Sequence, residues 1–399
     1  MANRVLFIGQ VWPEPASSAA GYRILQLMRA FAIHSYEVHF ATAAEPTQRS
    51  ADLHQEGVVT HRIALNSSTF QDFVKVLDLR VVVYDRYYTE EQFSWRVREV
   101  STSIIHILDT EDLHFLRTDR DETSDPEKVA EVRNRELASI YRSDLSLIIS
   151  SFEQRYLTEF LQISGDLLAY LPFWQENYQA ESNQFDNTAD FYFIGNLSHK
   201  PNTAAVHKLA RIWPDIKLRL PQAELFVYGN YVPQALLKYH SPEQGFHLAG
   251  AFDKPLDMLR AHRILLAPLS FGAGLKGKIY EAMLYGIPFV STSIGVEGFE
   301  LTEPNEVTAD DDTDFVLKAV ALYSDADLWT PTSLNLQSDF EMQFGTSRYI
   351  DNFFKQLSQV ITNVELHRRR NPVGDILRQQ AFTAAKYLSK YIEQKNKQI

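Results

Sequence analysis

The chain has 399 residues, of which 45% are hydrophobic and 12% aromatic, so it is long enough for two ordinary α/β domains and has the composition of a folded protein. Its formal net charge of -12 argues against general nucleic-acid binding, which requires a basic surface that neutralises phosphates. The absence of cysteine excludes disulfides, thiolate metal sites and a cysteine nucleophile.

Hydrophobic runs along the chain are short. The first, residues 5–8, is too short for the core of a signal peptide, and no run approaches the ~18–20 apolar residues of a membrane-spanning helix. We therefore expect a cytoplasmic protein that lies at most peripherally on the inner face of the membrane.

The first half of the chain alternates short β-rich runs with helical segments. After the strand at residues 5–8 comes a loop and then an amphipathic helix at about 21–32. Further strands are predicted at 37–41, 58–63, 81–84, 104–108 and 145–150. Runs such as 104–108 lack alternation, as expected for strands that are covered on both faces. This pattern predicts a doubly wound parallel sheet, which we assign to an N-terminal domain at 1–172.

A polar, strand-poor stretch at residues 173–187 predicts an interdomain linker. A second domain is expected at 188–340, followed by a helix at 341–364 that packs back toward the first domain. The strands of the second domain are predicted at 191–194, 224–228, 246–248, 264–267 and 289–292. Two such domains would form a cleft between the carboxyl ends of their strands, where open α/β sheets bind ligands.

The last segment, residues 365–399, is basic within an acidic protein, with eight basic and three acidic residues and a net charge of +5. An apolar stripe recurs there at steps of four and three, which predicts an amphipathic helix: Leu377, Ala381, Ala384, Leu388 and Tyr391. The stripe would pack on the protein's own body, or it would mediate self-association or contact with an anionic membrane.

Residues 264–298 carry the strongest functional signal, a predicted strand, glycine-rich loop, helix and second strand. The loop contains three glycines, Gly272, Gly274 and Gly277. Glycines let backbone N–H groups approach an anion, and the helix N-terminus adds partial positive charge. Lys276 and Lys278 flank that terminus, where a lysine is unfavourable for the helix dipole unless an anion is bound.

Glu281 lies about one turn inside the same predicted helix. A carboxylate just beyond a phosphate-binding loop can accept two hydrogen bonds from vicinal ribose hydroxyls, as in dinucleotide sites. The structural alternative is a tight turn with surface lysines and a solvated glutamate. Three glycines, two lysines and a glutamate in one βαβ unit favour a nucleotide-type ligand instead.

This segment resembles the donor-binding region of the group 1 (family 4) retaining glycosyltransferases. Residues 278–292, KIYEAMLYGIPFVST, match the family pattern K-x-x-E-A-M-x-x-G-x-P-x-V-x-T. Residues 193–202, FIGNLSHKPN, resemble the opening strand and loop of the family's C-terminal domain, and residues 109–117, DTEDLHFLR, resemble an N-terminal domain motif. The resemblance implies the GT-B fold, two Rossmann-like doubly wound domains facing a central cleft, here with an extra C-terminal helix.

The resemblance also implies roles for individual residues. Glu281 would bind the donor ribose, and Lys200 and Lys278 would contact the diphosphate and stabilise its charge. The remaining donor-side contacts would come from Gly21, Gly195, Phe252, Gly272, Gly274, Leu275 and Lys276. Phe252 would lie near the base, although ordinary packing explains it equally well.

The sequence departs from the family pattern at one position. Many members carry a glutamate near the transferred sugar, at the position that Ala273 occupies here. Some members with a G-x-G-x-x-x-K loop also lack this glutamate. The departure bears on the identity of the sugar and on turnover.

In the N-terminal half, the resemblance implies that Gly21 faces the diphosphate and acceptor, with Arg23 as a second candidate. A helix cap with a surface arginine is the alternative. The family also places a histidine or an acid after the strand at 104–108 to contact the transferred sugar or acceptor, so we expect Asp109, Asp112 and His114 there. An N-terminal helix cap would explain Asp112, and packing would explain His114.

We therefore expect a retaining, hexosyl-type glycosyltransferase that needs neither a cofactor nor a metal, since the positive groups at the glycine loop can stabilise a leaving diphosphate. Its donor would be a UDP- or GDP-linked sugar, and its acceptor a glycan, a lipid-linked molecule or a protein, in cell-surface polysaccharide or glycoconjugate synthesis. The alternatives are a catalytically weak GT-B homologue that acts as a glycan-binding or partner subunit, and a sugar-nucleotide epimerase.

Overall fold

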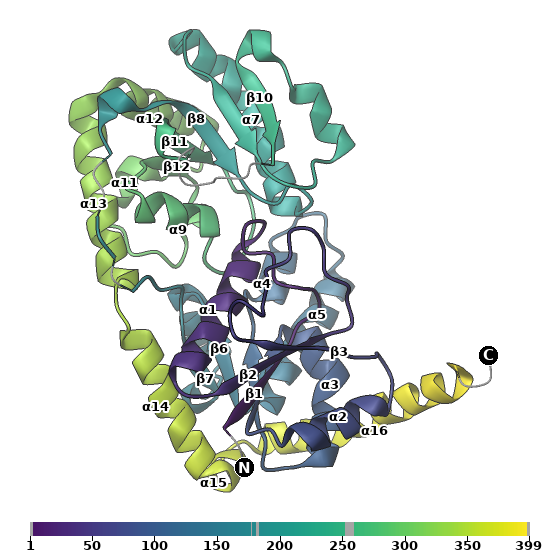
Figure 1. The fold of residues 1–399 in the computed structure, drawn as a ribbon. Coiled ribbons are helices and arrows are strands. Elements are labelled where there is room, and N and C mark those ends of the chain that lie inside the picture. Colours follow the sequence, from purple (N-terminus) through teal and green to yellow (C-terminus); the bar gives the residue numbers. More distant parts are fainter. Residues whose placement is uncertain (1–2, 177, 181–182, 252–258, 397–399) are drawn as a thin grey trace. The chain divides into compact units, whose positions relative to one another are not determined.

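The computed structural model describes residues 3–176, 178–180, 183–251 and 259–396 and is drawn in Figure 1. It divides into two compact units. Unit 1 comprises Met1–Pro15, Ala20–Leu171 and Arg348–Ile399, and unit 2 comprises Ala16–Ala19 and Pro172–Ser347. The C-terminal part of the chain therefore belongs to the same unit as the N-terminal strands.

Unit 1 is built on a seven-stranded sheet in the order β3-β2-β1-β4-β5-β6-β7, in which every registered pair is parallel. Its strands are β1 (Arg4–Ile8), β2 (Glu37–Thr42), β3 (Val59–Arg62), β4 (Val81–Asp85), β5 (Ile105–Asp109), β6 (Leu145–Ile148) and β7 (Leu168–Tyr170). Strands β4, β5 and β6 are buried at every residue, which explains their lack of alternation. The predicted parallel sheet is confirmed, and only the three-residue β7 was not predicted.

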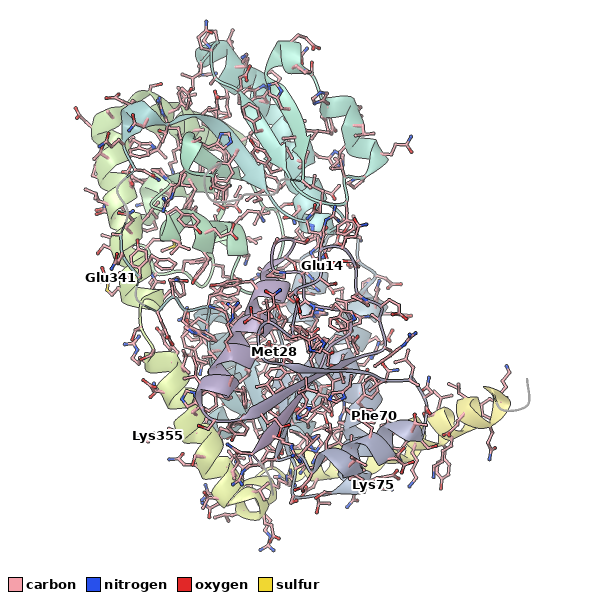
Figure 2. All side chains as sticks on the ribbon, in the orientation of Figure 1. Glu14, Met28, Phe70, Lys75, Glu341 and Lys355 are labelled. Atoms are coloured by element: carbon pink, nitrogen blue, oxygen red, sulfur yellow. The ribbon has the colours of Figure 1, made fainter. Side chains whose placement is uncertain are left out.

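The connections between these strands are mostly helical. The helices are α1 (Ala19–Ile33), α2 (Thr69–Leu77), α3 (Tyr87–Val100), α4 (His114–Asp119), α5 (Pro126–Arg142) and α6 (Ser151–Arg155), with the short turns η1 (Tyr156–Phe160) and η2 (Gly165–Leu167). Met28 of α1 and Phe70 of α2 are buried, whereas Lys75 at the end of α2 is exposed (Figure 2). The apolar sides of these helices thus form the core over the sheet.

Three C-terminal helices complete unit 1: α14 (Arg348–Thr362), α15 (Val364–Arg369) and α16 (Pro372–Asn396). Arg368 fastens α15 to the body, because its Nε and Nη2 donate to the two carboxylate oxygens of Asp144, each at 2.7 Å. Asn371 follows it and donates to the carbonyl of Tyr141 at 2.7 Å. The predicted basic tail is therefore helical, and part of its charge is used inside unit 1.

Unit 2 is built on a five-stranded sheet in the order β10-β9-β8-β11-β12, again with parallel pairs throughout. Its strands are β8 (Ala189–Ile194), β9 (Leu225–Tyr228), β10 (Phe246–Gly250), β11 (His262–Ala267) and β12 (Phe289–Ser291). Its helices are α7 (Lys200–Arg219), α9 (Gly277–Leu284), α10 (Ser293–Val296), α11 (Pro304–Val307), α12 (Asp312–Ser324) and α13 (Ala326–Phe344), with the 3-10 turns η3 (Phe185–Asn187), η4 (Gln234–Tyr239) and η5 (Pro242–Gln244).

The core of unit 2 lies against one face of this sheet. Phe191 and Phe193 of β8 pack there with Leu209 of α7 and Phe315 of α12, all with little or no exposed surface. The structure therefore has two parallel sheets with flanking helices, as predicted for an α/β protein. In the part of the chain that the structure describes, no helix is long and apolar enough to cross a membrane.

Candidate functional site

The glycine loop of unit 2 joins β11 to α9 at the carboxyl edge of the sheet (Figure 1). Gly272 has φ 155° and Gly274 has φ 65°, a backbone conformation that residues with a side chain rarely adopt. Lys276 is the N-cap residue of α9, whose first turn begins at Gly277. The N-terminus of a helix carries partial positive charge, so the start of α9 is suited to an anion.

The two lysines of the loop lie in different surroundings. Lys276 is only 7% exposed, and its Nζ donates to the carbonyl of Gly274 at 2.8 Å. Its ammonium group therefore forms a hydrogen bond within the loop and places a buried positive charge there. Leu275, between these residues, is also 7% exposed.

Lys278 connects the start of α9 to the loop that follows β8. Its Nζ donates to Asn202 Oδ1 at 3.0 Å, and Asn202 Nδ2 donates to the carbonyl of Asn196 at 2.8 Å. A Cβ on Gly195 would lie 2.7 Å from Asn202 Nδ2, so a side chain there would displace the Asn202 amide. The structure thus brings together two predicted residues, Lys278 and Gly195, through an asparagine that was not predicted.

A second residue missed from the sequence is Gly229, directly after β9. A Cβ there would lie 2.0 Å from the carbonyl oxygen of Gly195, so the ends of β8 and β9 can approach this closely only with glycine. The pairs Gly229-Asn230 after a strand and Pro201-Asn202 at a helix start were the available sequence signals. Neither signal indicates which residue it would face, because that depends on strand order.

Lys278 and Glu281 have displaced pKa values. Burial lowers the pKa of Lys278 to about 8, with Lys276 lowering it further and Glu281 opposing the change. Burial raises the pKa of Glu281 to about 7, and Lys278 opposes that change. A diphosphate beside Lys278 and hydroxyl donors beside Glu281 would favour the charged form of each group, so the site is suited to a ligand with both.

Helix α9 is held from behind by α13. Tyr280 packs against Phe173, Phe340 and Phe344 with ring centroids 5.0, 5.0 and 5.2 Å apart. At its end, Gly286 has φ 60° and its carbonyl accepts a 2.5 Å hydrogen bond from Ser333 Oγ. This packing fixes the direction in which the N-terminus of α9 points.

The remaining donor-side predictions fall at separate places. Lys200 is the exposed first residue of α7. Gly250, in the region expected to bind the base, has φ 73° at the end of β10, whereas Phe252 lies outside the described residues. Ala273 is part of the glycine loop, and the carboxylate that many family members carry is accordingly missing there.

In unit 1, the predicted Asp109 ends β5 and pairs with Arg23 of α1. Arg23 Nη2 lies 2.9 Å from Asp109 Oδ1, and the two side chains are 0% and 3% exposed. Arg23 Nη1 also donates to the carbonyl of Leu171 at 2.8 Å. The surface arginine that we considered as the alternative is therefore wrong, since Arg23 is a buried partner of Asp109.

Gly21 lies inside α1, two residues before Arg23. A Cβ on Gly21 would lie 2.5–2.7 Å from backbone atoms of Glu14, so the loop before α1 crosses the helix at a distance that only glycine permits. Glu14 in turn accepts a hydrogen bond from Thr47 Oγ1 at 2.5 Å. The structure thus explains Gly21 by the course of this loop, and its proposed ligand contact stays a prediction.

Asp112 and His114 lie together after β5. The N-cap of α4 is Leu113, so the capping role considered for Asp112 is wrong; Asp112 forms an ion pair with Arg117 instead. His114 Nε2 lies 3.3 Å from Asp112 Oδ1, but burial lowers the pKa of His114 to about 4. The imidazole is therefore neutral at neutral pH and available as a hydrogen-bonding group rather than as a cation.

Three charged residues of the same sheet edge were not predicted: Asp85, Arg86 and Glu111. Asp85 ends β4 beside Asp109, its register partner on β5. Arg86 follows with φ 69°, and Glu111 has φ 64°. Only the register between β4 and β5 brings these residues together, which sequence spacing does not reveal. Among the described residues, no group of three or more His, Asp or Glu side chains is arranged to hold a metal ion.

Comparisons with known proteins bear on the family and the fold. Residues 188–325 match the family model described as glycosyl transferases group 1. No curated protein sequence matches the chain significantly.

Several solved structures are similar over most of the chain. Sucrose-phosphate synthase from Thermosynechococcus elongatus superposes with a TM-score of 0.67 at 13% identity, covering 90% of this chain and 99% of that one. Anabaena HepE in complex with UDP-glucose gives 0.66 at 13% identity, covering 89% and 99%. TarM, which S. aureus carries, gives 0.71 at 7% identity, covering 89% and 99%.

These neighbours are GT-B glycosyltransferases, and the fold of this chain is therefore GT-B. The matched family model makes residues 188–325 similar to the group 1 glycosyltransferases, the family that the sequence resembles.

Proposed function

We propose that the protein transfers a sugar, with retention at the anomeric carbon, from a UDP- or GDP-linked donor to a hydroxyl of a glycan, a lipid-linked molecule or a protein. The observation that carries this proposal is the glycine loop with Lys278 and Glu281. Its ammonium groups and the N-terminus of α9 suit a diphosphate, and its carboxylate suits a ribose. HepE has been crystallised with UDP-glucose, which makes UDP-glucose the first donor to test.

The proposed chemistry uses the loop to stabilise the leaving group. The bond between the anomeric carbon and the diphosphate oxygen breaks, and negative charge develops on the diphosphate next to Lys278 and the N-terminus of α9. The acceptor hydroxyl forms the new bond from the same face, and its proton passes to the departing phosphate oxygen. No metal is required, since the positive groups of the loop supply the charge.

A thermal-shift screen against UDP-, GDP-, ADP- and CMP-linked sugars tests the donor. Binding to the folded state raises stability by about 2.7 kcal/mol when the ligand is at a hundredfold excess over its Kd. We expect a rise with one UDP- or GDP-linked sugar that the Glu281→Ala variant loses. A rise that persists in this variant would remove the ribose assignment, and no rise with any donor would contradict the proposed function.

The second candidate, a glycan-binding or partner subunit without turnover, is favoured by Ala273, where many members carry a carboxylate. Incubation with radiolabelled nucleotide sugars separates the candidates. Transfer or slow donor hydrolysis supports the enzyme, free sugar epimerisation supports an epimerase, and retention of intact donor supports the binding subunit.

We also propose that the outer side of α16 contacts the inner face of an anionic membrane or a second copy of the chain. Tyr387, Leu388 and Tyr391 are 67%, 62% and 64% exposed beside the exposed Lys390. Tyrosines and a lysine on one side of a helix suit a lipid interface. Deletion from Glu365 onward should reduce binding to anionic liposomes or change oligomer size, and no change in either would leave α16 as a packing element alone.

A further inference from the structure

The carboxyl edge of the unit 1 sheet holds more acids than bases. Asp85 and Asp109 end neighbouring strands, and Glu111 follows two residues later. Asp109 pairs with Arg23 at 2.9 Å, and Asp85 lies 3.6 Å from Arg86. Two arginines therefore match two of the three carboxyl groups.

Glu111 is the third carboxyl group, and it takes part in neither of these ion pairs. Its Oε1 is buried and has no hydrogen-bond partner within the described residues. Burial, with Asp109 and Asp85 adding to the effect, raises the pKa of Glu111 to about 8, while Arg86 and Arg23 oppose it. At neutral pH, Glu111 is thus an uncharged acid whose hydrogen-bonding capacity the protein does not use.

A structural role does not account for this residue, as two neighbouring glutamates show. Glu136 accepts hydrogen bonds from the backbone N–H groups of His114 and Phe115 at 3.1 and 2.9 Å, and Glu153 accepts one from Leu113 at 2.9 Å. Both bind the start of α4 and thereby stabilise the fold. Glu111 has a positive φ that disfavours any residue except glycine, asparagine or aspartate, and no contact of this kind compensates.

The charges at the site indicate which ligand would use Glu111. With Glu111 uncharged, the carboxylates of Asp85 and Asp109 balance Arg23 and Arg86, so no unmatched charge is present to attract an ionic group. A protonated carboxyl can donate one hydrogen bond and accept another, as a hydroxyl group also can. The complementary ligand is an uncharged molecule rich in hydroxyl groups.

We propose that Glu111 binds a hydroxyl group of an uncharged sugar acceptor and thereby determines which acceptor is used. The inference rests on the proposed glycosyl transfer and adds to it the acceptor class and the residue that recognises it. In this role the neutral carboxyl donates to one hydroxyl oxygen and accepts from the same or an adjacent hydroxyl. Arg86, held by its 2.7 Å hydrogen bond to Tyr88, lies 3.6 Å from Asp85.

The test uses UDP-glucose as donor and p-nitrophenyl glycosides of glucose, galactose, mannose and N-acetylglucosamine as acceptors. We expect Glu111→Leu to raise the acceptor KM at least tenfold, with UDP-glucose hydrolysis in the absence of acceptor changed less than twofold. Glu111→Gln, which keeps a donor and an acceptor, should stay within threefold of the parent at pH 7. Glu122→Leu, at an exposed loop position of the same unit, is the matched control.

The pH profile distinguishes recognition from packing. Above pH 8 the parent should lose acceptor affinity as Glu111 ionises, whereas Glu111→Gln should not, because its amide does not titrate. Both proteins retain Lys278. The ratio of their acceptor KM values at each pH therefore reports the titration of Glu111 alone. An unchanged acceptor KM in Glu111→Leu, or the same pH profile in the parent and Glu111→Gln, would overturn the inference.

Two further readouts keep the inference testable. If Glu111→Leu does not fold, as shown by its thermal unfolding, the comparison between the parent and Glu111→Gln decides. If the parent neither hydrolyses nor transfers any donor, the proposed function fails, and 13C-labelled glutamate then tests Glu111 itself. A carboxyl resonance that titrates near pH 8, is lost in Glu111→Gln and shifts when the glycosides are added supports the inference; a resonance that the glycosides leave unmoved contradicts it.

Discussion

The two units carry charged groups at the same place, the carboxyl edge of a parallel sheet, but they assemble them differently. In unit 2 the groups come from one continuous segment, the glycine loop and the first turn of α9. Lys278 of this segment donates a hydrogen bond to Asn202. In unit 1 they come from α1 and from two separate strands, with Arg23 and Asp109 86 residues apart in the chain. A local motif suffices for the first arrangement, whereas the second exists only through strand register and burial.

The largest effect should come from the buried ion pair of unit 1. Removing the cation in Arg23→Met leaves Asp109 buried without a counter-charge, which we expect to lower the free energy of unfolding by about 3–5 kcal/mol. Arg29→Met is the matched control, because Arg29 pairs with Glu56 while 52% exposed and should cost less than about 1 kcal/mol. Urea unfolding of both variants measures the difference in the free energy of unfolding. Equal losses would show that burial does not increase the contribution of the Arg23–Asp109 ion pair.

The corresponding change in unit 2 should affect binding more than folding. Lys278→Met removes one charged hydrogen-bond donor, which contributes about 1.5–3 kcal/mol, so we expect nucleotide affinity to fall ten- to hundredfold. Isothermal titration with UDP measures it, and Lys208→Met, a lysine of α7 paired with Asp312, is the control. If both variants bind equally well, Lys278 does not contact the diphosphate.

The sequence predicted the local motif of unit 2 better than the site of unit 1, which strand register assembles. The strands, the parallel sheets and the glycine loop were predicted because each depends on residues that are neighbours in the chain. Asp85 and Arg86 were missed because only the pairing of Asp85 with Asp109 in register brings them to this edge. Glu111 lies within the motif at residues 109–117, but its buried Oε1 could not be inferred from the sequence. Asn202 was missed for the same reason, since its contact with Lys278 spans 76 residues.

Burial rules out the structural alternatives considered for two further residues. A surface arginine was the alternative to a ligand contact at Arg23, yet its side chain is 0% exposed. A helix cap was the alternative to a ligand contact at Asp112, yet backbone N–H groups at the start of α4 donate to Glu136 of α5. In both cases the deciding contact lies with a residue that is distant in sequence.

After these two changes, we expect the next largest effect from a substitution where β8 and β9 approach closely. In Gly229→Ala the added Cβ would lie 2.0 Å from the carbonyl oxygen of Gly195, so the backbone must move, and we expect a loss of about 1–3 kcal/mol in stability. Gly165→Ala is the control, and we expect it to raise stability rather than lower it. Its Cβ would meet no atom within 4 Å, and a lower chain entropy in the unfolded state should raise stability by about 0.4–1 kcal/mol. Thermal unfolding of the two variants tests this, and a Gly229→Ala protein as stable as the parent would contradict the geometry.

The smallest effect is the pH dependence of nucleotide affinity, about tenfold per unit of pH on each limb. Glu281 must be ionised to accept ribose hydroxyls, and its pKa is about 7, so affinity should fall as the pH drops below 7. Lys278 must be protonated to hold the diphosphate, and its pKa is about 8, so affinity should also fall as the pH rises above 8. Titration of UDP from pH 5.5 to 9.5 should give a bell-shaped curve whose acid limb Glu281→Gln removes; a flat profile would show that neither group faces the ligand.

The most direct measurement is a crystal structure of the protein with UDP. We predict that the diphosphate lies against the backbone N–H groups between Gly272 and Gly277, with Lys278 Nζ within hydrogen-bond distance of a phosphate oxygen and Glu281 bound to the ribose hydroxyls. A nucleotide bound elsewhere, or a loop whose amides are taken up by the protein itself, would contradict the account.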